Sequence, residues 1–178
     1  MLKRILILPL LIVSLQAQMG ITINGGMFMS SPTGDGSDDM DALLAPTFGV
    51  SYAVGPVVTG AQYYSIGMTF DDSGITMETT LNYLGLYAMY PLALGPVTLG
   101  AGAMYGQPMG GNMKVEGSPG GLLDSDIDVE AGDMDSDLGV VINVNYPVTD
   151  AIGIGVGLIY GLGDVEHMTL GGGVSYSL

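Results

Sequence analysis

The sequence predicts an all-β fold, an eight-stranded antiparallel up-and-down transmembrane β-barrel. Three observations lead to this fold class. Hydrophobic residues make up 48% of the 178-residue chain and charged residues only 12%, well below the roughly 25% charge of soluble domains. After residue 18, no apolar run approaches the about 20 residues that a membrane-spanning helix needs. Segments of about ten residues instead alternate between apolar and small or polar residues, which is the pattern of membrane-spanning β-strands.

The C-terminal segment, His167–Leu178, shows this alternation most clearly. Its even-numbered positions are Met168, Leu170, Gly172, Val174, Tyr176 and Leu178, and its odd-numbered positions are polar or small. Successive side chains of a strand point to opposite faces. We therefore expect a strand with one apolar face that closes the barrel against the first strand.

The N-terminus has the three-part layout of a secretory signal peptide. Lys3 and Arg4 are followed by the apolar core Ile5–Leu15 and by the small residue Ala17. We predict a signal peptide over residues 1–17 and one barrel domain over 18–178; the alternative is a first core strand or an anchor helix. Cleavage leaves Lys114 as the one basic residue beside 18 acidic ones. Such a polyanion does not bind nucleic acid by releasing counterions.

The alternation predicts eight strands joined by short and longer connections. The expected strands are Ile21–Met29, Thr47–Val54, Val57–Phe70, Ile75–Tyr90, Val97–Gly106, Asp137–Tyr146, Ala151–Gly163 and His167–Leu178. The expected short turns are Gly55-Pro56, Pro91–Gly95 and Pro147–Asp150, and the longer loops include Pro32–Leu44 and Gln107–Ser136. An even strand number with both termini at the short-turn end is the rule for bacterial barrels.

Tyrosines indicate how the strands face. Tyr52, Tyr90 and Tyr146 each precede a short turn, where a membrane interface favours an aromatic girdle. If Tyr90 faces lipid as Tyr52 does, then Leu84, Leu86 and Ala88 also face outward, and Tyr83, Tyr87 and Met89 fill the interior. Near Gln62 the alternation is ambiguous, and we expect a bulge or mixed facing there.

The acidic residues are polarised along the predicted barrel. Every acidic residue except Asp150 falls in or beside a longer connection, at the end away from the termini. A soluble two-sheet sandwich has no reason to separate charge in this way, whereas a barrel across an asymmetric membrane does.

The topology, the signal peptide and the closing strand together resemble the small eight-stranded outer-membrane β-barrels of Gram-negative bacteria, the OmpA/OmpX-type group. Gly173, Tyr176 and Leu178 are similar to the C-terminal signal of that group, although its usual last residue is Phe. The resemblance implies export to the outer membrane, periplasmic termini, contact with outer-membrane lipid, folding by a barrel-insertion machine and a monomeric state. It brings no catalytic or binding motif.

The segment 124–137 contains a row of alternating acids. Asp124, Asp126, Asp128 and Glu130 share one face of an extended strand, and oxygen ligands of this kind suit Ca²⁺. The segment is not an EF-hand loop, because Val129 stands where that loop needs Gly. These four residues are the one candidate metal site, for a divalent cation. The interpretation that the sequence favours is a solvated acidic loop that keeps the surface repulsive.

His167, the single histidine, is the only candidate for catalysis. Thr169 lies on the same face and Glu166 lies beside it, and a His–hydroxyl–acid set supports acyl transfer in a few lipid-modifying barrels. A lone histidine at a rim is more often structural, so we predict no enzyme, no catalytic residue and no cofactor other than Ca²⁺. Inward glycines either leave a narrow apolar cavity or make room for Phe28, Tyr83 and Tyr87, and we favour the packed interior.

These observations favour a non-enzymatic outer-membrane scaffold whose acidic loops contact cations, lipid or other surfaces. A narrow transport barrel for small solutes is the alternative, and a lipid-modifying enzyme comes third.

Overall fold

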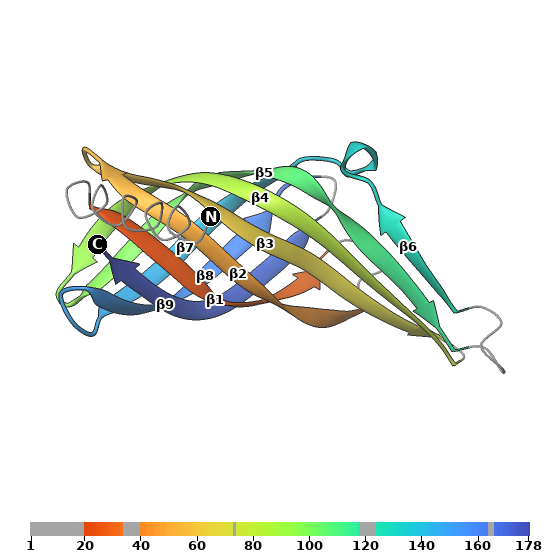
Figure 1. The fold of residues 1–178 in the computed structure, drawn as a ribbon. Helices are drawn as coiled ribbons and strands as arrows, with labels where there is room; N and C mark the ends of the chain where they lie inside the picture. The colour runs from red at the N-terminus through yellow and green to blue at the C-terminus, as the bar shows by residue number, and fades with distance from the viewer. Residues whose placement is uncertain (1–19, 34–39, 73, 118–123, 164–165) are drawn as a thin grey trace, which may run out of the picture.

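The computed structural model describes residues 20–33, 40–72, 74–117, 124–163 and 166–178. The predicted signal peptide, residues 1–17, lies outside the described residues. The strands are β1 (Ile21–Pro32), β2 (Met40–Val54), β3 (Val57–Asp72), β4 (Ile75–Leu94), β5 (Val97–Glu116), β6 (Ser125–Val129), β7 (Asp137–Pro147), β8 (Ile152–Gly161) and β9 (His167–Ser177), with one 3-10 turn, η2 (Ala131–Asp133) (Figure 1). No helix in the described residues has the length and apolar character to cross a membrane.

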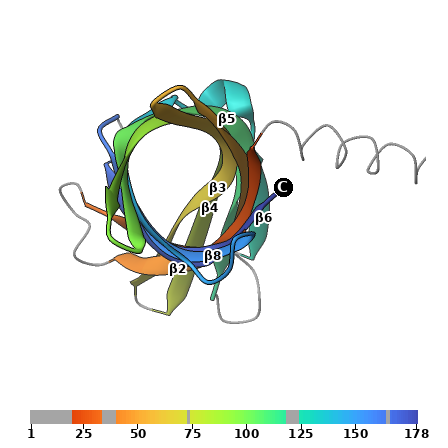
Figure 2. The same ribbon diagram turned by 90° about the vertical axis from the view of Figure 1, so that its left-hand side faces the viewer.

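The strands form a closed antiparallel barrel. The sheet order is β4-β3-β2-β1-β9-β8-β7-β5-β6, and an additional β4–β5 pairing completes the ring, which Figure 2 shows nearly end-on. The closing strand β9 pairs with β1 over its whole length, from Thr22 opposite Ser177 to Pro32 opposite His167. The ninth strand, β6, pairs only with β5 and takes no part in closing the ring. The predicted closure of the last strand on the first and the predicted eight-stranded barrel are therefore both confirmed.

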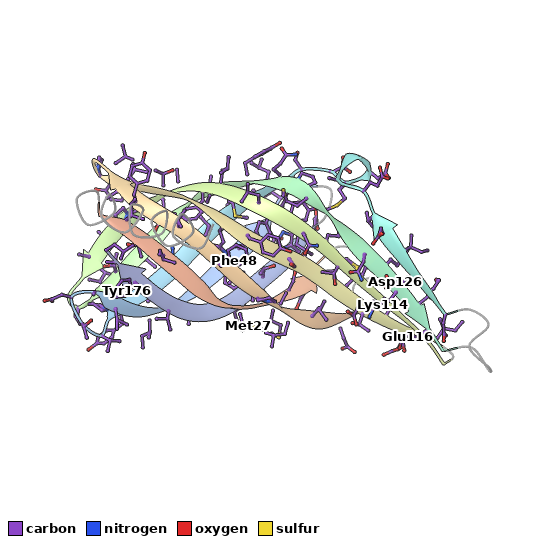
Figure 3. The ribbon with its side chains drawn as sticks, viewed as in Figure 1. Met27, Phe48, Lys114, Glu116, Asp126 and Tyr176 are labelled. Atoms are coloured by element: carbon purple, nitrogen blue, oxygen red, sulfur yellow. The ribbon has the colours of Figure 1, made fainter. Side chains whose placement is uncertain are left out.

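Apolar side chains cover the outside of the barrel. Met27, Phe48 and Tyr176 point away from it in Figure 3 and are 43%, 61% and 48% exposed. The predicted facing of β4 is confirmed, since Leu84, Leu86 and Ala88 are exposed while Tyr83, Tyr87 and Met89 are buried. The predicted girdle residues Tyr52, Tyr90 and Tyr146 are also exposed near the short turns. Such an apolar exterior with aromatics at its edge is adapted to lipid.

Several strands are longer than the sequence predicts. β2 begins at Met40 and not at Thr47, and β4 continues through Pro91 to Leu94. The predicted loop Gln107–Ser136 is wrong in part, because β5 continues to Glu116 and pairs with β6. Lys114 lies in register with Glu78 on one side and Asp126 on the other. Opposite charges at directly facing positions stabilise a strand pair by about 0.2–1 kcal/mol, which favours this hairpin over an open loop.

The irregularity expected near Gln62 lies on the neighbouring strand. Gln62 is in regular register with Gly49, and the β2–β3 register shifts between Ala42 and Phe48. Pro46 lies inside this interval, and a proline cannot donate a hydrogen bond to the ladder. The bulge therefore forms where β2 already lacks a backbone donor.

Glycines make room for the large interior side chains. A Cβ atom at Gly60 would lie 2.6 Å from the Tyr87 hydroxyl, and one at Gly85 would lie 2.7 Å from Sδ of Met104. Both distances are too short for a side chain to be added without movement of its neighbour. The favoured prediction, that inward glycines accommodate aromatic residues, is confirmed at Gly60, whereas Gly85 makes room for a methionine.

Candidate functional site

A buried polar network lies inside the outer mouth of the barrel, the end away from the termini. Its members come from strands distant in sequence: Ser30 from the end of β1, Tyr64 from β3, Asp137 from the start of β7, and His167 and Thr169 from the start of β9. Ser30, Tyr64, His167 and Thr169 are 0% exposed and Asp137 is 3% exposed. We call these five residues the mouth network.

The mouth network is a continuous chain of hydrogen bonds. The Tyr64 hydroxyl donates to Oδ2 of Asp137 at 2.6 Å. Nε2 of His167 lies 3.1 Å from the same oxygen, and Nδ1 lies 2.9 Å from Oγ1 of Thr169. The Thr169 hydroxyl in turn donates to Oγ of Ser30 at 2.9 Å. The network therefore ties β1, β3, β7 and β9 together across the lumen.

Asp137 is the centre of the mouth network. A carboxylate only accepts hydrogen bonds, so Nε2 of His167 and the Tyr64 hydroxyl both donate to Oδ2 of Asp137. The contact between His167 and Asp137 is an ion pair when the ring is protonated. A buried carboxylate of this kind is tolerated only when it is paired and hydrogen-bonded.

An apolar cluster fills the lumen beside the mouth network. Tyr64 stacks on Tyr83 with ring centroids 5.5 Å apart, and Ile66, Met104 and Ile159 are buried around them. The segment before β7 folds over this cluster: Met134 packs against it, and the Tyr83 hydroxyl donates to the carbonyl oxygen of Asp135 at 3.4 Å. The outer half of the lumen is consequently filled by side chains.

The sequence offered His167, Thr169 and Glu166 as a possible catalytic set, and the structure replaces the acid of this set. His167 and Thr169 do meet, but the acid beside the ring is Asp137, whereas Glu166 is exposed. A hydroxyl, a histidine and a carboxylate in hydrogen-bonded order resemble a nucleophile–base–acid set. Thr169 is fully buried, so a substrate could reach its hydroxyl only if the surrounding side chains moved.

An uncharged cavity occupies the inner half of the lumen. It has a volume of about 370 Å³, and its lining residues include Asn24, Gln62, Tyr87, Asn143 and Phe28. Thr22 and Ser177, which are paired at the short-turn end of the barrel, also line it. The sequence left open whether the interior is packed or contains a cavity. The structure shows both, with a packed outer half and a cavity in the inner half.

The predicted acidic row lies on a protrusion that we call the β-arm, formed by residues 75–82, 110–116 and 125–129 (Figure 1). Asp126 and Asp128 have the same parity on β6 and face Lys114 and Asn112, and Figure 3 shows Lys114, Glu116 and Asp126 near the tip. Oδ1 of Asp124 instead accepts a hydrogen bond from the Gly117 amide at 3.3 Å.

Glu130, the fourth predicted ligand, precedes η2 and makes no capping bond with its side chain. Within the described ranges, no three His, Cys, Asp or Glu residues are grouped so that they could hold a metal ion. Cation binding at the predicted row therefore stays a prediction.

Sequence reasoning missed most of the mouth network. It counted Asp137 among the loop acids and did not single out Ser30 or Tyr64 for a site. The sequence did contain one indication for Asp137. It is an even number of residues from the inward residues Gly139 and Asn143 on the same strand, so it faces the lumen as they do.

Solved structures share this fold. Neisserial surface protein A is similar with a TM-score of 0.60 and 18% identity, over 89% of this chain and 97% of that chain. The attachment invasion locus protein Ail of Yersinia pestis, in complex with the heparin analogue sucrose octasulfate, gives a TM-score of 0.59 and 16% identity, over 90% and 99%. A de novo designed transmembrane β-barrel gives a TM-score of 0.53 and 12% identity, over 90% of this chain and 97% of that chain.

Neither a comparison with protein-family models nor one with curated proteins gives a match. The structural likeness, the closed ring and the apolar exterior agree with one another. The chain has the fold of the small eight-stranded outer-membrane β-barrels.

Proposed function

We propose that this protein is an integral outer-membrane barrel with a closed lumen, which acts as a non-enzymatic scaffold and presents the β-arm at the cell surface. The observation that carries the proposal is the filled outer mouth, where the buried His167–Asp137 pair and an apolar cluster occupy the lumen. A mouth filled by side chains supports a structural role over transport. The partners that we propose are outer-membrane lipid, a barrel-insertion machine and no second copy of the chain.

The two faces of the β-arm suit contact with other molecules. Directly paired residues of neighbouring strands lie on the same face of a sheet, so the register gives the β-arm one charged and one apolar face. The charged face holds Glu78, Lys114, Glu116, Asp126 and Asp128, and the opposite face holds Met77, Met113, Val115 and Ile127. Ile127 and Met77 are 47% and 37% exposed. An acidic face beside an exposed apolar face favours contact with cationic or amphipathic partners.

The charge of the β-arm also distinguishes this chain from one similar structure. Ail is solved with a heparin analogue, which is a polyanion. Lys114 is the single lysine or arginine after position 4, so we expect this chain to repel such a ligand. Divalent cations, Ca²⁺ among them, are part of the proposal as bridges between the β-arm and other anionic groups.

Cysteine labelling of intact Gram-negative cells tests the orientation. The chain contains no cysteine, so Ser125→Cys on β6 and Asp150→Cys in the β7–β8 turn each introduce a single thiol. We expect a bulky membrane-impermeant maleimide to label Ser125→Cys on intact cells, and Asp150→Cys only after the outer membrane is permeabilised. Both positions are exposed, so burial does not bias the comparison.

The reverse labelling pattern would place the β-arm in the periplasm and remove the surface role. Equal labelling of both variants on intact cells, with a periplasmic marker protein still protected, would show that the chain does not span the membrane.

A further inference from the structure

The cavity in the inner half of the lumen has a composition that nothing in the surface role requires. Its polar lining residues are amides and hydroxyls, among them Asn24, Ser51, Gln62, Asn143 and Asn145, and none of the charged residues that the structure describes lines it. Phe28 and Tyr87 add aromatic surface. From this lining we propose that the cavity is a binding site for a small, uncharged, polyhydroxylated solute of about monosaccharide size, and this inference does not depend on what the β-arm contacts.

An unpaired donor points to a ligand group. The side-chain amide nitrogen of Gln62 is buried and has no hydrogen-bond partner among the described residues. A buried donor without an acceptor costs about 1–3 kcal/mol, and a hydroxyl oxygen of a bound solute would supply the missing acceptor. Amides and hydroxyls both donate and accept, as the hydroxyls of a sugar do.

The charge and size of the cavity narrow the ligand class. A charged solute would lose its hydration without meeting a counter-charge, which is strongly unfavourable. The volume of about 370 Å³ is near the lower end of the roughly 300–1,000 Å³ of small-molecule sites. Tyr64, Met104 and Ile159 close the outer end, so the solute enters from the short-turn end, past Thr22 and Ser177.

Two leucine substitutions provide a matched pair of variants. Gly157 lines the cavity, and a Cβ atom there would lie 3.8 Å from the carbonyl oxygen of Ile142 and 4.0 Å from Phe28, so Gly157→Leu adds bulk without a backbone clash. Ala88 is exposed on the outer face of β4 and does not line the cavity. Ala88→Leu therefore places a leucine side chain toward lipid and leaves the lumen unchanged.

Saturation-transfer NMR of the refolded full chain in deuterated detergent tests the proposal, with D-glucose and D-galactose as probes and glucose 6-phosphate as the charged control. We expect transfer from protein aromatic protons to at least one neutral sugar and none to the phosphate. The signal should be lost in Gly157→Leu, reduced in Gln62→Leu, and kept in Ala88→Leu.

Heat-modifiable migration in gels confirms that each variant is folded before it is compared. Absence of transfer to both neutral sugars in the folded wild-type chain would overturn the proposal and leave a cavity that holds water. A signal that survives in folded Gly157→Leu would equally overturn it, because binding would then lie outside the lumen.

Discussion

His167→Ala is expected to lower the free energy of unfolding by about 3–5 kcal/mol, the cost of leaving a buried charge, here the Asp137 carboxylate, without one of its partners. The ring accounts for two bonds of the mouth network, and its loss leaves Asp137 buried with the Tyr64 hydroxyl as its remaining named donor. Reversible denaturant unfolding of the barrel in lipid vesicles, followed by circular dichroism, measures the change.

Glu166→Ala is the matched control for this prediction. Glu166 directly precedes His167 but is exposed, so its truncation should change stability by less than about 0.5 kcal/mol. The variant with both His167→Leu and Asp137→Leu should be less destabilised than the sum of the two single variants, because removing both charges leaves neither unpaired. Equal effects of His167→Ala and Glu166→Ala would show that the pair is not formed in the membrane.

Tyr64→Ala is expected to destabilise the barrel by a similar amount, about 3–5 kcal/mol, as for other large buried aromatic residues. Tyr64 is fully buried, stacks on Tyr83 and donates to Asp137. Tyr64→Phe keeps the ring and removes only the hydroxyl, so its cost should be about 1.5–3 kcal/mol, the range for a hydrogen bond to a charged group. The same unfolding measurement gives both values.

The control for Tyr64 is a tyrosine on the outer face. Tyr105 is 44% exposed in the structure, and Tyr105→Ala removes the same atoms from the lipid-facing surface. A loss in Tyr64→Ala no greater than that in Tyr105→Ala would mean that the interior is loosely packed, and the closed lumen would lose its support.

Much of the barrel could be predicted from the sequence because its physical rule is local. Alternation places side chains on two faces, and the facing of β4 around Tyr83, Leu84 and Tyr87 followed from it. The closure of β9 on β1 followed from an apolar strand at the end of the chain. Polarised acids and the tyrosines before short turns also predict the direction of the barrel relative to a membrane, which the cysteine-labelling experiment tests.

The β-arm escaped prediction because its evidence is split between two segments. Residues 112–116 and 125–129 each alternate over too few residues to indicate a strand alone, and the surrounding glycines and acids are typical of a loop. Only the register that places Lys114 between Glu78 and Asp126 shows that they pair.

The mouth network escaped prediction for a different reason. Ser30 and Thr169 are 139 residues apart, and Tyr64 and Asp137 are 73 apart. Parity shows that such residues face inward, but their height along the barrel depends on the stagger of every intervening strand. The identity of the acid beside His167 could therefore not be read from its sequence neighbour Glu166.

Single-channel recording in a planar lipid bilayer tests the closed lumen most directly. Refolded wild-type protein, shown to be folded by heat-modifiable migration, should produce no discrete conductance steps, because the mouth network and the apolar cluster fill the outer half of the lumen. Reproducible openings of the folded wild-type protein would contradict the scaffold account and favour the narrow transport barrel.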